Sequence, residues 1–331
     1  MLPNNLHEIA EYLVADSKGI LAADESSGSI KKKFDKVGIP DSEENHRKYR
    51  QMLFSSPGVE QYISGVIMFD ETFRQKNDQG MLFPEFLASK NILPGIKVDL
   101  GKIESPSFPQ EFYTEGLDGL GQRFEEYASL GAKFAKWRAV ITVGLGKPSQ
   151  AVVRVNAMAL ARYAELAQKA GIVPIVEPEV IADGDHSIDD CEIATHTTLD
   201  IIFEELLRLE INLSEMLLKP NMVIEGIHHS EKAAPEEIAE RTVNVFRKTV
   251  PKDVAGIVFL SGGQTADQAT QNLCAISKIE NKPWPMSFSY GRALQDDALA
   301  AWSGKDENIE QAQRVFLDRA QKNSAARQGN C

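Results

Sequence analysis

Short apolar runs alternate with longer amphipathic segments along the chain. The apolar runs are rich in β-branched residues and begin roughly 30 to 45 residues apart, which is typical of strands buried in a parallel sheet. This spacing predicts eight strands: "GILAADES" from Gly19, "SGVIMF" from Ser64, "PGIKVD" from Pro94, "FAKWRAV" from Phe134, "VPIVEPE" from Val173, "MLLKPNM" from Met216, "GIVFLSG" from Gly256 and "MSFSYGR" from Met286.

The segments between the runs have the periodicity of amphipathic helices. Apolar residues recur at helical spacing over 199–207, and a helix over 152–170 is expected to stop at Gly171. Pro235 followed by two glutamates marks a helix start, and a terminal helix is expected from Ile309. Because no linker interrupts this alternation, we expect one domain, 1–331, folded as a (β/α)8 TIM barrel with N-terminal and C-terminal helical extensions.

A doubly wound open sheet is the alternative architecture. Such a sheet usually carries a Gly-rich phosphate turn after its first strand, and "ADESSGS" does not match that pattern.

The composition excludes several functional classes. The chain has 331 residues and a net charge of −12, which argues against general nucleic-acid binding. It has no uncharged apolar stretch long enough for a membrane span, and its first residues do not resemble a secretory signal. Cys191, Cys274 and Cys331 have neither metal-type nor redox-type spacing, so we expect free thiols in a reducing cytoplasm.

Charged residues interrupt the expected strands near their carboxyl ends, where barrel enzymes build their active sites. An ion-paired plug that closes the barrel is the structural alternative. Apolar residues would close a barrel at least as well as so many buried ions, so we favour a site. The residues are Asp24, Lys97, Lys136, Arg138, Glu177, Glu179 and Lys219, of which Arg138 and Glu179 could be supporting pairs.

Three of these residues come from neighbouring strands and suggest a reaction. Lys136, Glu177 and Lys219 are expected side by side. Burial and a nearby cation both favour the neutral, nucleophilic form of a lysine amine. A carboxylate such as Glu177 can then move protons, so the set suggests Schiff-base chemistry on a carbonyl substrate.

Two loops offer phosphate-binding groups. "LSGGQTAD" contains Ser261, Gly262 and Gly263, and "SYGRAL" contains Gly291 and Arg292. Backbone N–H groups, a hydroxyl and a guanidinium suit a phosphate, and barrels often bind phosphate after strands seven and eight. Alone, "SGG" would be an ordinary strand-to-helix turn.

A second candidate phosphate site follows the first strand in "ESSGSIKKK". Ser26, Ser29, Lys32 and Lys33 could bind an anion there. The alternative is a helix capped by Ser26 or Ser29 with a solvated basic face, which is the interpretation we prefer for Lys31.

The motifs "GILAADESSGSI", "GIKVD", "FAKWR", "IVPIVEPE", "LLKPNMV", "FLSGGQ" and "FSYGRAL" together resemble class I fructose-1,6-bisphosphate aldolase, in order and across nearly the whole chain. The resemblance implies a (β/α)8 barrel that uses a lysine Schiff base and no metal or other cofactor. It implies reversible cleavage of fructose 1,6-bisphosphate to dihydroxyacetone phosphate and glyceraldehyde 3-phosphate, in glycolysis and gluconeogenesis. A cytoplasmic homotetramer is implied as well.

The resemblance also implies residue roles. Lys219 would form the Schiff base, Glu177 would shuttle protons, Asp24 would help deprotonate the C4 hydroxyl, and Lys136 would support both carboxylates. Contacts to the ketone-side phosphate would come from Ser261, Gly262, Gly291 and Arg292, and contacts to the far end of the substrate from Ser26, Ser29 and Lys97.

The chain departs from animal members of the family at two places. Lys32 and Lys33 stand where those members have lysine and arginine, which predicts weaker binding of the far phosphate. The longer tail of those members, which ends in a tyrosine, is not seen after Cys331.

Two other functions stay open at this point. A metal-dependent aldolase or phosphosugar isomerase would need ligands, for which 183–186 and the pair His228 and His229 are the best candidates, although polar loop residues explain both. A scaffold that binds partner proteins on the barrel surface is the non-enzymatic alternative.

Overall fold

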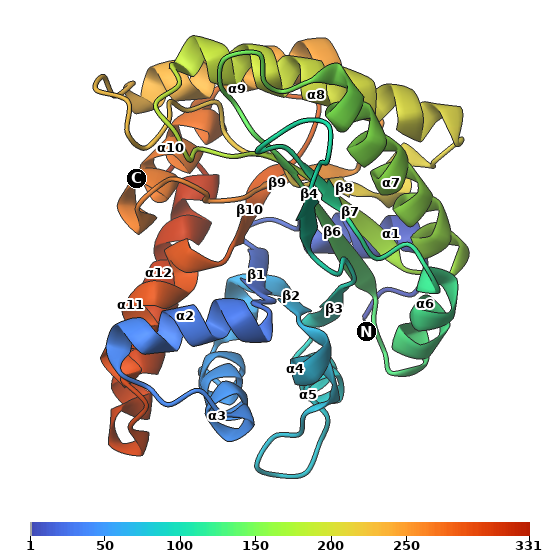
Figure 1. Ribbon diagram of the computed structural model, residues 1–331. Helices are drawn as coiled ribbons and strands as arrows, with labels where there is room; N and C mark the ends of the chain where they lie inside the picture. The colour runs from blue at the N-terminus through green and yellow to red at the C-terminus, as the bar shows by residue number, and fades with distance from the viewer. Residues whose placement is uncertain (1) are drawn as a thin grey trace.

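The computed structural model describes residues 2–331, and Met1, the first residue of the expected domain, lies outside the described residues. Eight parallel strands form a closed barrel in the order β1-β10-β9-β8-β7-β6-β3-β2. Figure 1 shows the strands at the centre with helices around them. The barrel strands are β1 (Gly19–Ala23), β2 (Ile63–Met68), β3 (Leu93–Lys97), β6 (Phe134–Ile141), β7 (Val173–Val180), β8 (Leu217–Leu218), β9 (Gly256–Phe259) and β10 (Met286–Tyr290).

All eight apolar runs form strands of this barrel, which excludes the doubly wound open sheet. Apart from the charged residues near their carboxyl ends, the runs are largely apolar because parallel strands in a barrel are covered on both faces. The sequence did not predict a small antiparallel hairpin after β3, made of β4 (Lys102–Glu104) and β5 (Phe112–Thr114). Each of its strands has three residues and β4 is fully exposed, so neither has a recognisable apolar pattern.

The helices lie where the amphipathic segments predicted them. The helix expected over 152–170 is α7 (Gln150–Lys169), and Gly171 follows it with a φ of 73°. The others are α1 (Leu6–Leu13), α2 (Ser27–Val37), α3 (Glu43–Phe54), α4 (Asp70–Arg74), α5 (Phe83–Ser89), α6 (Leu120–Ser129), α8 (Ile188–Arg208), α9 (Pro235–Thr249), α10 (Ala266–Lys278), α11 (Arg292–Trp302) and α12 (Ile309–Arg327), with short 3-10 turns at Val59–Gln61, Leu213–Glu215 and Asp306–Asn308.

The hydrophobic residues form two clusters. The larger one lies between the strands and the surrounding helices. The smaller one lies inside the barrel at the amino ends of the strands, where α1 packs against them (Figure 1). Its members are Ile9, Ala10, Leu13, Val14, Ile20, Ala22, Ile67, Leu93, Phe134, Val173, Ile175, Leu217 and Val258. The N-terminal helix therefore closes one end of the barrel with apolar side chains.

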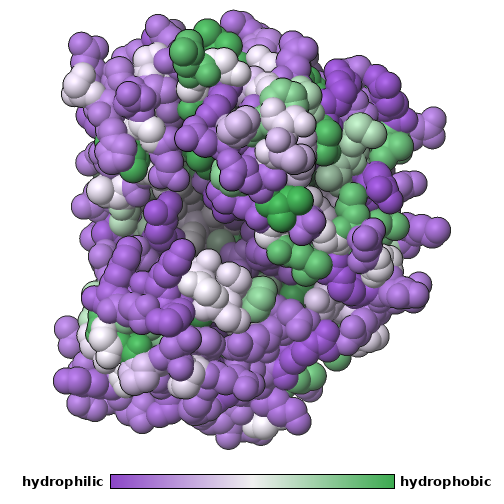
Figure 2. All heavy atoms as spheres, viewed as in Figure 1, coloured by the Kyte–Doolittle hydropathy of each residue, from purple (hydrophilic) through white to green (hydrophobic). Residues whose placement is uncertain are grey.

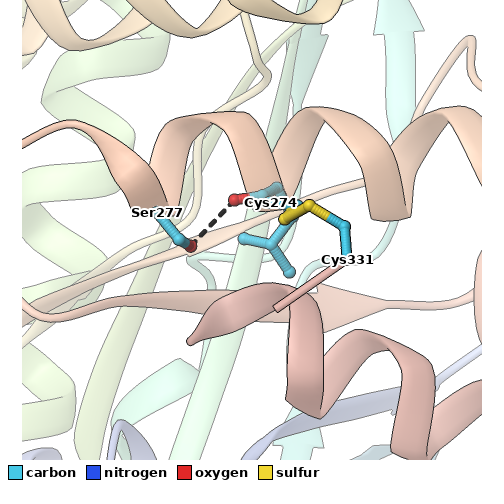
Figure 3. The surroundings of a disulfide bond; sticks show 4 residues. Cys274, Ser277 and Cys331 are labelled. Carbon is cyan, nitrogen blue, oxygen red and sulfur yellow. Dashed lines mark hydrogen bonds between the residues drawn. A yellow bond between two sulfur atoms is a disulfide. The ribbon is translucent and has the colours of Figure 1, made fainter. Parts of the chain in front are cut away.

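The expectation of three free thiols is wrong for two of the cysteines. Cys274 on α10 and Cys331 form a disulfide, as Figure 3 shows, whereas Cys191 is free and buried. The two bonded cysteines are 57 residues apart in the sequence. They meet because α12 packs against α10 and brings the end of the chain next to it, which cysteine spacing cannot reveal.

No helix in residues 2–331 combines the length and the apolar character that a membrane span requires. Within the same residues, no three His, Cys, Asp or Glu side chains are grouped so that they could hold a metal ion.

Candidate active site

A cavity of about 290 Å³ opens at the carboxyl ends of the barrel strands. Figure 2 shows a hollow with a largely hydrophilic rim on the face in view. The cavity is lined by Ala22, Asp24, Glu25, Ser26, Ser29, Lys33, Lys97, Lys136, Arg138, Glu177, Glu179, Lys219, Leu260, Ser261, Gly262, Ser289, Gly291 and Arg292. A larger cavity of about 620 Å³ lies between α9 and α10, but it contains none of the expected site residues.

Four charged side chains form a continuous row at the floor of the smaller cavity. The Lys136 ammonium lies 2.7 Å from Asp24 and 3.0 Å from Glu177. The other carboxylate oxygen of Glu177 lies 3.0 Å from the Lys219 ammonium. Lys136, Glu177 and Lys219 are each at most 4% exposed, so this row is shielded from bulk water.

Strand register explains why these residues meet. Lys136 on β6 pairs with Lys97 on β3, and on the other side β6 runs in register with β7 over its whole length. Lys219 directly follows β8, and its backbone N–H donates to the Val176 carbonyl on β7 at 2.8 Å. Side chains two residues apart on a strand share a face, so Lys136, Glu177 and Lys219 all point to the barrel axis.

The row is arranged so that its charges persist. Burial opposes the charge on Lys136, but Asp24 and Glu177 outweigh it and raise the pKa of this ammonium. Burial likewise opposes the carboxylates, yet Lys136 and Lys219 lower the pKa of both Asp24 and Glu177. With the cavity empty, Lys136 is therefore a cation between two carboxylate anions near neutral pH.

One oxygen of Glu177 can still accept a hydrogen bond. Its Oε2 is within ion-pair distance of Lys136 but accepts no hydrogen bond from any group in residues 2–331. A buried oxygen without a donor is unusual in a folded protein. This oxygen could accept a proton from a molecule bound in the cavity.

A second layer of ion pairs surrounds the row. Arg138 donates to Glu179, and Glu179 helps to raise the pKa of the guanidinium against the effect of burial. Lys97 bonds both to the Asp99 carboxylate, at 2.7 Å, and to the Asp99 carbonyl, at 2.8 Å. These contacts hold the basic side chains of β3 and β6 at the cavity wall.

The loops after β9 and β10 bring Ser261, Gly262, Gly291 and Arg292 to one side of the cavity. Gly291 precedes α11, whose first turn has no side-chain cap, so its N–H groups are available to an anion. Within residues 2–331, no carboxylate lies within ion-pair distance of Arg292, which leaves its guanidinium free as well. We call these four residues the β9–β10 anion site.

The backbone at both glycines of this site lies close to other atoms. A Cβ on Gly262 would lie 2.7 Å from a carboxylate oxygen of Glu179. A Cβ on Gly291 would lie 3.3 Å from the Ala22 carbonyl of β1. A side chain at position 262 would require the Glu179 carboxylate to move, and one at position 291 would be tight against β1.

The opposite side of the cavity is formed by the start of α2. Ser26 occupies the N-cap position, but its hydroxyl donates to Ser29 at 3.2 Å and makes no capping bond. The helix N-terminus therefore faces the cavity with open N–H groups. Lys33 also lines this side, whereas Lys32 is exposed and does not line the cavity.

Comparison with known proteins identifies the family of this chain. A model of the family described as "Fructose-bisphosphate aldolase class-I" matches residues 5–331. The chain belongs to the class I fructose-bisphosphate aldolase family. The resemblance seen in the sequence motifs is thus confirmed, and the chain is placed among lyases.

Individual relatives of this aldolase are similar in sequence to nearly the whole chain. The "Probable fructose-bisphosphate aldolase class 1" of Xanthomonas campestris is 50% identical over 326 residues, covering 98% of this chain and 97% of the relative. "Fructose-bisphosphate aldolase 4, cytosolic" of Arabidopsis thaliana is 48% identical over 97% of this chain and 82% of the relative. Plasmodium falciparum aldolase, solved with TRAP and a small-molecule inhibitor, superposes with a TM-score of 0.97 and 44% identity over 99% of this chain and 96% of that one.

Not every residue singled out in the sequence reaches the cavity of the aldolase. Gly263 has a φ of 77° and lines a neighbouring pocket rather than this one. Conversely, sequence reasoning did not assign a role to Glu25, Asp99 or Ser289. Asp99 and Ser289 lie within the quoted motifs "GIKVD" and "FSYGRAL", but only the structure shows their contacts with the site.

Proposed function

We propose that this aldolase reversibly cleaves fructose 1,6-bisphosphate to dihydroxyacetone phosphate and glyceraldehyde 3-phosphate through a Schiff base on Lys219. The observation that carries the proposal is the position of the Lys219 amine. It is buried, it faces the cavity, and it lies 3.0 Å from the Glu177 carboxylate, whose second oxygen accepts no hydrogen bond within residues 2–331. A nucleophilic lysine with an adjacent proton carrier is the arrangement that imine formation requires.

Glu177 would move the protons of imine formation. The Lys219 ammonium gives a proton to Glu177, and the neutral amine attacks the C2 carbonyl of the open-chain ketose to form a carbinolamine. Loss of the C2 hydroxyl as water requires a proton, which Glu177 returns. The product is an iminium ion whose positive charge attracts the electron pair released in the next step.

Asp24 would accept the C4 hydroxyl proton while the C3–C4 bond breaks. The electron pair of that bond moves onto the iminium to give an enamine, and the C4 oxygen becomes the aldehyde of glyceraldehyde 3-phosphate. The lowered pKa of Asp24 keeps it ionised before the substrate arrives. Lys136, 2.7 Å away, holds the carboxylate in place and offsets its charge.

Two phosphates would anchor the substrate on opposite sides of the cavity. The β9–β10 anion site, Ser261, Gly262, Gly291 and Arg292, suits the phosphate on the ketone side. Ser26, Ser29, Lys33 and Lys97 suit the far phosphate. Two open helix N-termini then face the two anions, and this supports a bisphosphate as the substrate.

We also propose that the enzyme is a cytoplasmic homotetramer that acts in glycolysis and gluconeogenesis. The names of two Arabidopsis thaliana relatives, fructose-bisphosphate aldolases 4 and 5, include the word cytosolic, which supports the location. Light scattering of the purified protein would give the mass of the assembly, and a mass equal to that of one 36.6 kDa chain would contradict the tetramer.

Borohydride trapping tests the proposed chemistry. Borohydride added with dihydroxyacetone phosphate should reduce the imine and leave a stable adduct, detected as an increase in intact mass. The control omits the ketose and should leave the mass unchanged. An unchanged mass in both samples would contradict Schiff-base formation, and activity lost on adding a chelator would revive a metal-dependent mechanism.

A further inference from the structure

A largely buried ion cluster, made of Glu25, Lys33 and Arg50, lies at the far-phosphate side of the cavity. Glu25 directly follows Asp24 at the end of β1, and each of its carboxylate oxygens meets a different cation. Oε1 lies 2.6 Å from the Lys33 ammonium, and Oε2 lies 2.8 Å from an Arg50 nitrogen. Burial opposes the charge on Glu25, but Lys33 and Arg50 outweigh it and lower its pKa to about 2.

Arg50 is the least accessible member of this cluster. It lies on α3, is 1% exposed, and is not part of the cavity wall. Its guanidinium donates to Gln295 on α11 at 3.3 Å and lies over the Tyr49 ring, while its Nε has no partner in residues 2–331. A buried guanidinium with an unsatisfied donor is costly, so its pairing with Glu25 calls for an explanation beyond stability.

Gln295 connects the same cluster to β1. It accepts from the Tyr49 hydroxyl at 3.1 Å and donates to the Ala22 carbonyl at 2.6 Å. Ala22 is two residues before Asp24. The position of Glu25 is thus fixed from α3 and α11 together, independently of Lys33.

Lys33, by contrast, is on the cavity side of Glu25. It lines the cavity, its side chain is 14% exposed, and it has a second carboxylate, Asp296, at 3.3 Å. Arg292, on the other side of the cavity, has no carboxylate partner within residues 2–331. The empty enzyme therefore leaves the Arg292 guanidinium available on the ketone side and holds the Lys33 ammonium on carboxylates on the far side.

We propose that Arg50 is a positioning residue that lets Glu25 hold Lys33 in the empty enzyme and release it to the far phosphate, so that the cluster sets the preference for a bisphosphate. The inference rests on the proposed function. When the Lys33 ammonium moves to a phosphate, Glu25 keeps Arg50 as its partner and no buried charge is left unpaired. Without Arg50, releasing Lys33 would leave the Glu25 carboxylate, whose side chain is only 12% exposed, without a cation, which is strongly unfavourable.

The test compares fructose 1,6-bisphosphate with fructose 1-phosphate, which lacks the far phosphate. Arg50→Met should lower the ratio of their kcat/KM values by about 10-fold, mainly by raising KM for the bisphosphate. Arg50→Lys, which keeps a cation, should recover part of the ratio. The matched control is Arg47→Met on the same helix, which removes surface ion pairs and should leave the ratio unchanged.

A purely structural role for Arg50 gives a different result. It would lower kcat/KM for both sugars by the same factor, and that outcome, or an unchanged ratio, would overturn the proposal. Borohydride trapping of each variant keeps the two proposals apart, because a variant that still forms the adduct retains the Schiff-base chemistry whatever its selectivity.

A second variant decides the question if Arg50→Met does not fold. Glu25→Gln removes the carboxylate that competes with the far phosphate for Lys33, while its amide oxygen can still accept from Arg50. The kcat/KM ratio should then rise, by about 3-fold, rather than fall. A ratio that stays the same or decreases would overturn the proposal.

Discussion

The two ends of the barrel are closed in opposite ways. At the amino ends of the strands, α1 contributes Leu13 and other apolar residues to a cluster that contains Phe134, Ile175 and Leu217. Two residues further along the same three strands, on the same face, the side chains are those of Lys136, Glu177 and Lys219. Within about 7 Å along each strand the barrel interior thus changes from apolar to ionic.

This difference separates two explanations of the buried charges. An ion-paired plug would be reasonable if the barrel had no other way to fill its interior. The amino end shows that the same strands are closed well by apolar side chains and a short helix. The ions at the carboxyl end are therefore not needed for closure, and chemistry on a bound molecule is the better explanation.

The largest expected effect comes from removing the nucleophile at the ionic end. Lys219→Met should lower kcat for bisphosphate cleavage by roughly 100,000-fold, because no other amine in the row can replace it. Circular dichroism should show an intact fold, and Lys169→Met, at an exposed position of α7, is the matched control. Appreciable residual turnover would show that Lys219 is not the nucleophile.

A charge placed at the apolar end should be damaging in a different way. Leu13→Lys puts an ammonium among apolar side chains with no partner, so we expect the free energy of unfolding to fall by about 4 kcal/mol. Chemical denaturation measures this, and Leu145→Lys, at a fully exposed leucine, should change nothing. If Leu13→Lys were equally harmless, the contrast between the two ends would be lost.

Acid should lower the stability of the folded protein through Glu25, which lies at the ionic end of the barrel. Glu25 has a folded-state pKa of about 2, below its ordinary value, so at intermediate pH the unfolded chain binds the proton and the folded protein does not. Its stabilising contribution is complete above about pH 5 and is lost as the pH falls toward 2. Denaturation midpoints between these limits should therefore fall more steeply for the wild type than for Glu25→Gln, and parallel curves would contradict this.

The smallest effect is expected from removing the disulfide, which is part of neither the apolar end nor the ionic end of the barrel. It ties Cys331 to α10, while Arg327 near the end of α12 donates to the Val14, Ala15 and Lys18 carbonyls. Cys331→Ser should lower the free energy of unfolding by about 2 kcal/mol and leave kcat/KM unchanged, since the cavity is elsewhere. A changed kcat/KM would show that the tether reaches the active site.

The sequence predicted the parts of the molecule that leave a periodic signal. The eight apolar runs reflect strands that are buried on both faces. The pattern that starts at Pro235 reflects a helix that is buried on one face. The row of charged side chains could be expected because alternation along the strands puts Lys136, Glu177 and Lys219 on one face. No such rule gives the apolar role of α1, which depends on where the helix packs.

Contacts between distant segments could not be predicted from the sequence. Arg50 and Glu25 meet across 25 positions, and Cys274 and Cys331 across 57. The partner of Lys33 was also missed, because "ESSGSIKKK" suggests a solvated basic face as readily as a held cation. Such pairings depend on how helices pack around the barrel.

Locating the borohydride adduct tests the central claim most directly. After reduction in the presence of dihydroxyacetone phosphate, the protein is digested and its lysine-containing peptides are examined by mass spectrometry. We expect one modified residue, Lys219, with Lys136 unmodified beside it. An adduct on Lys136, or none on Lys219, would contradict it.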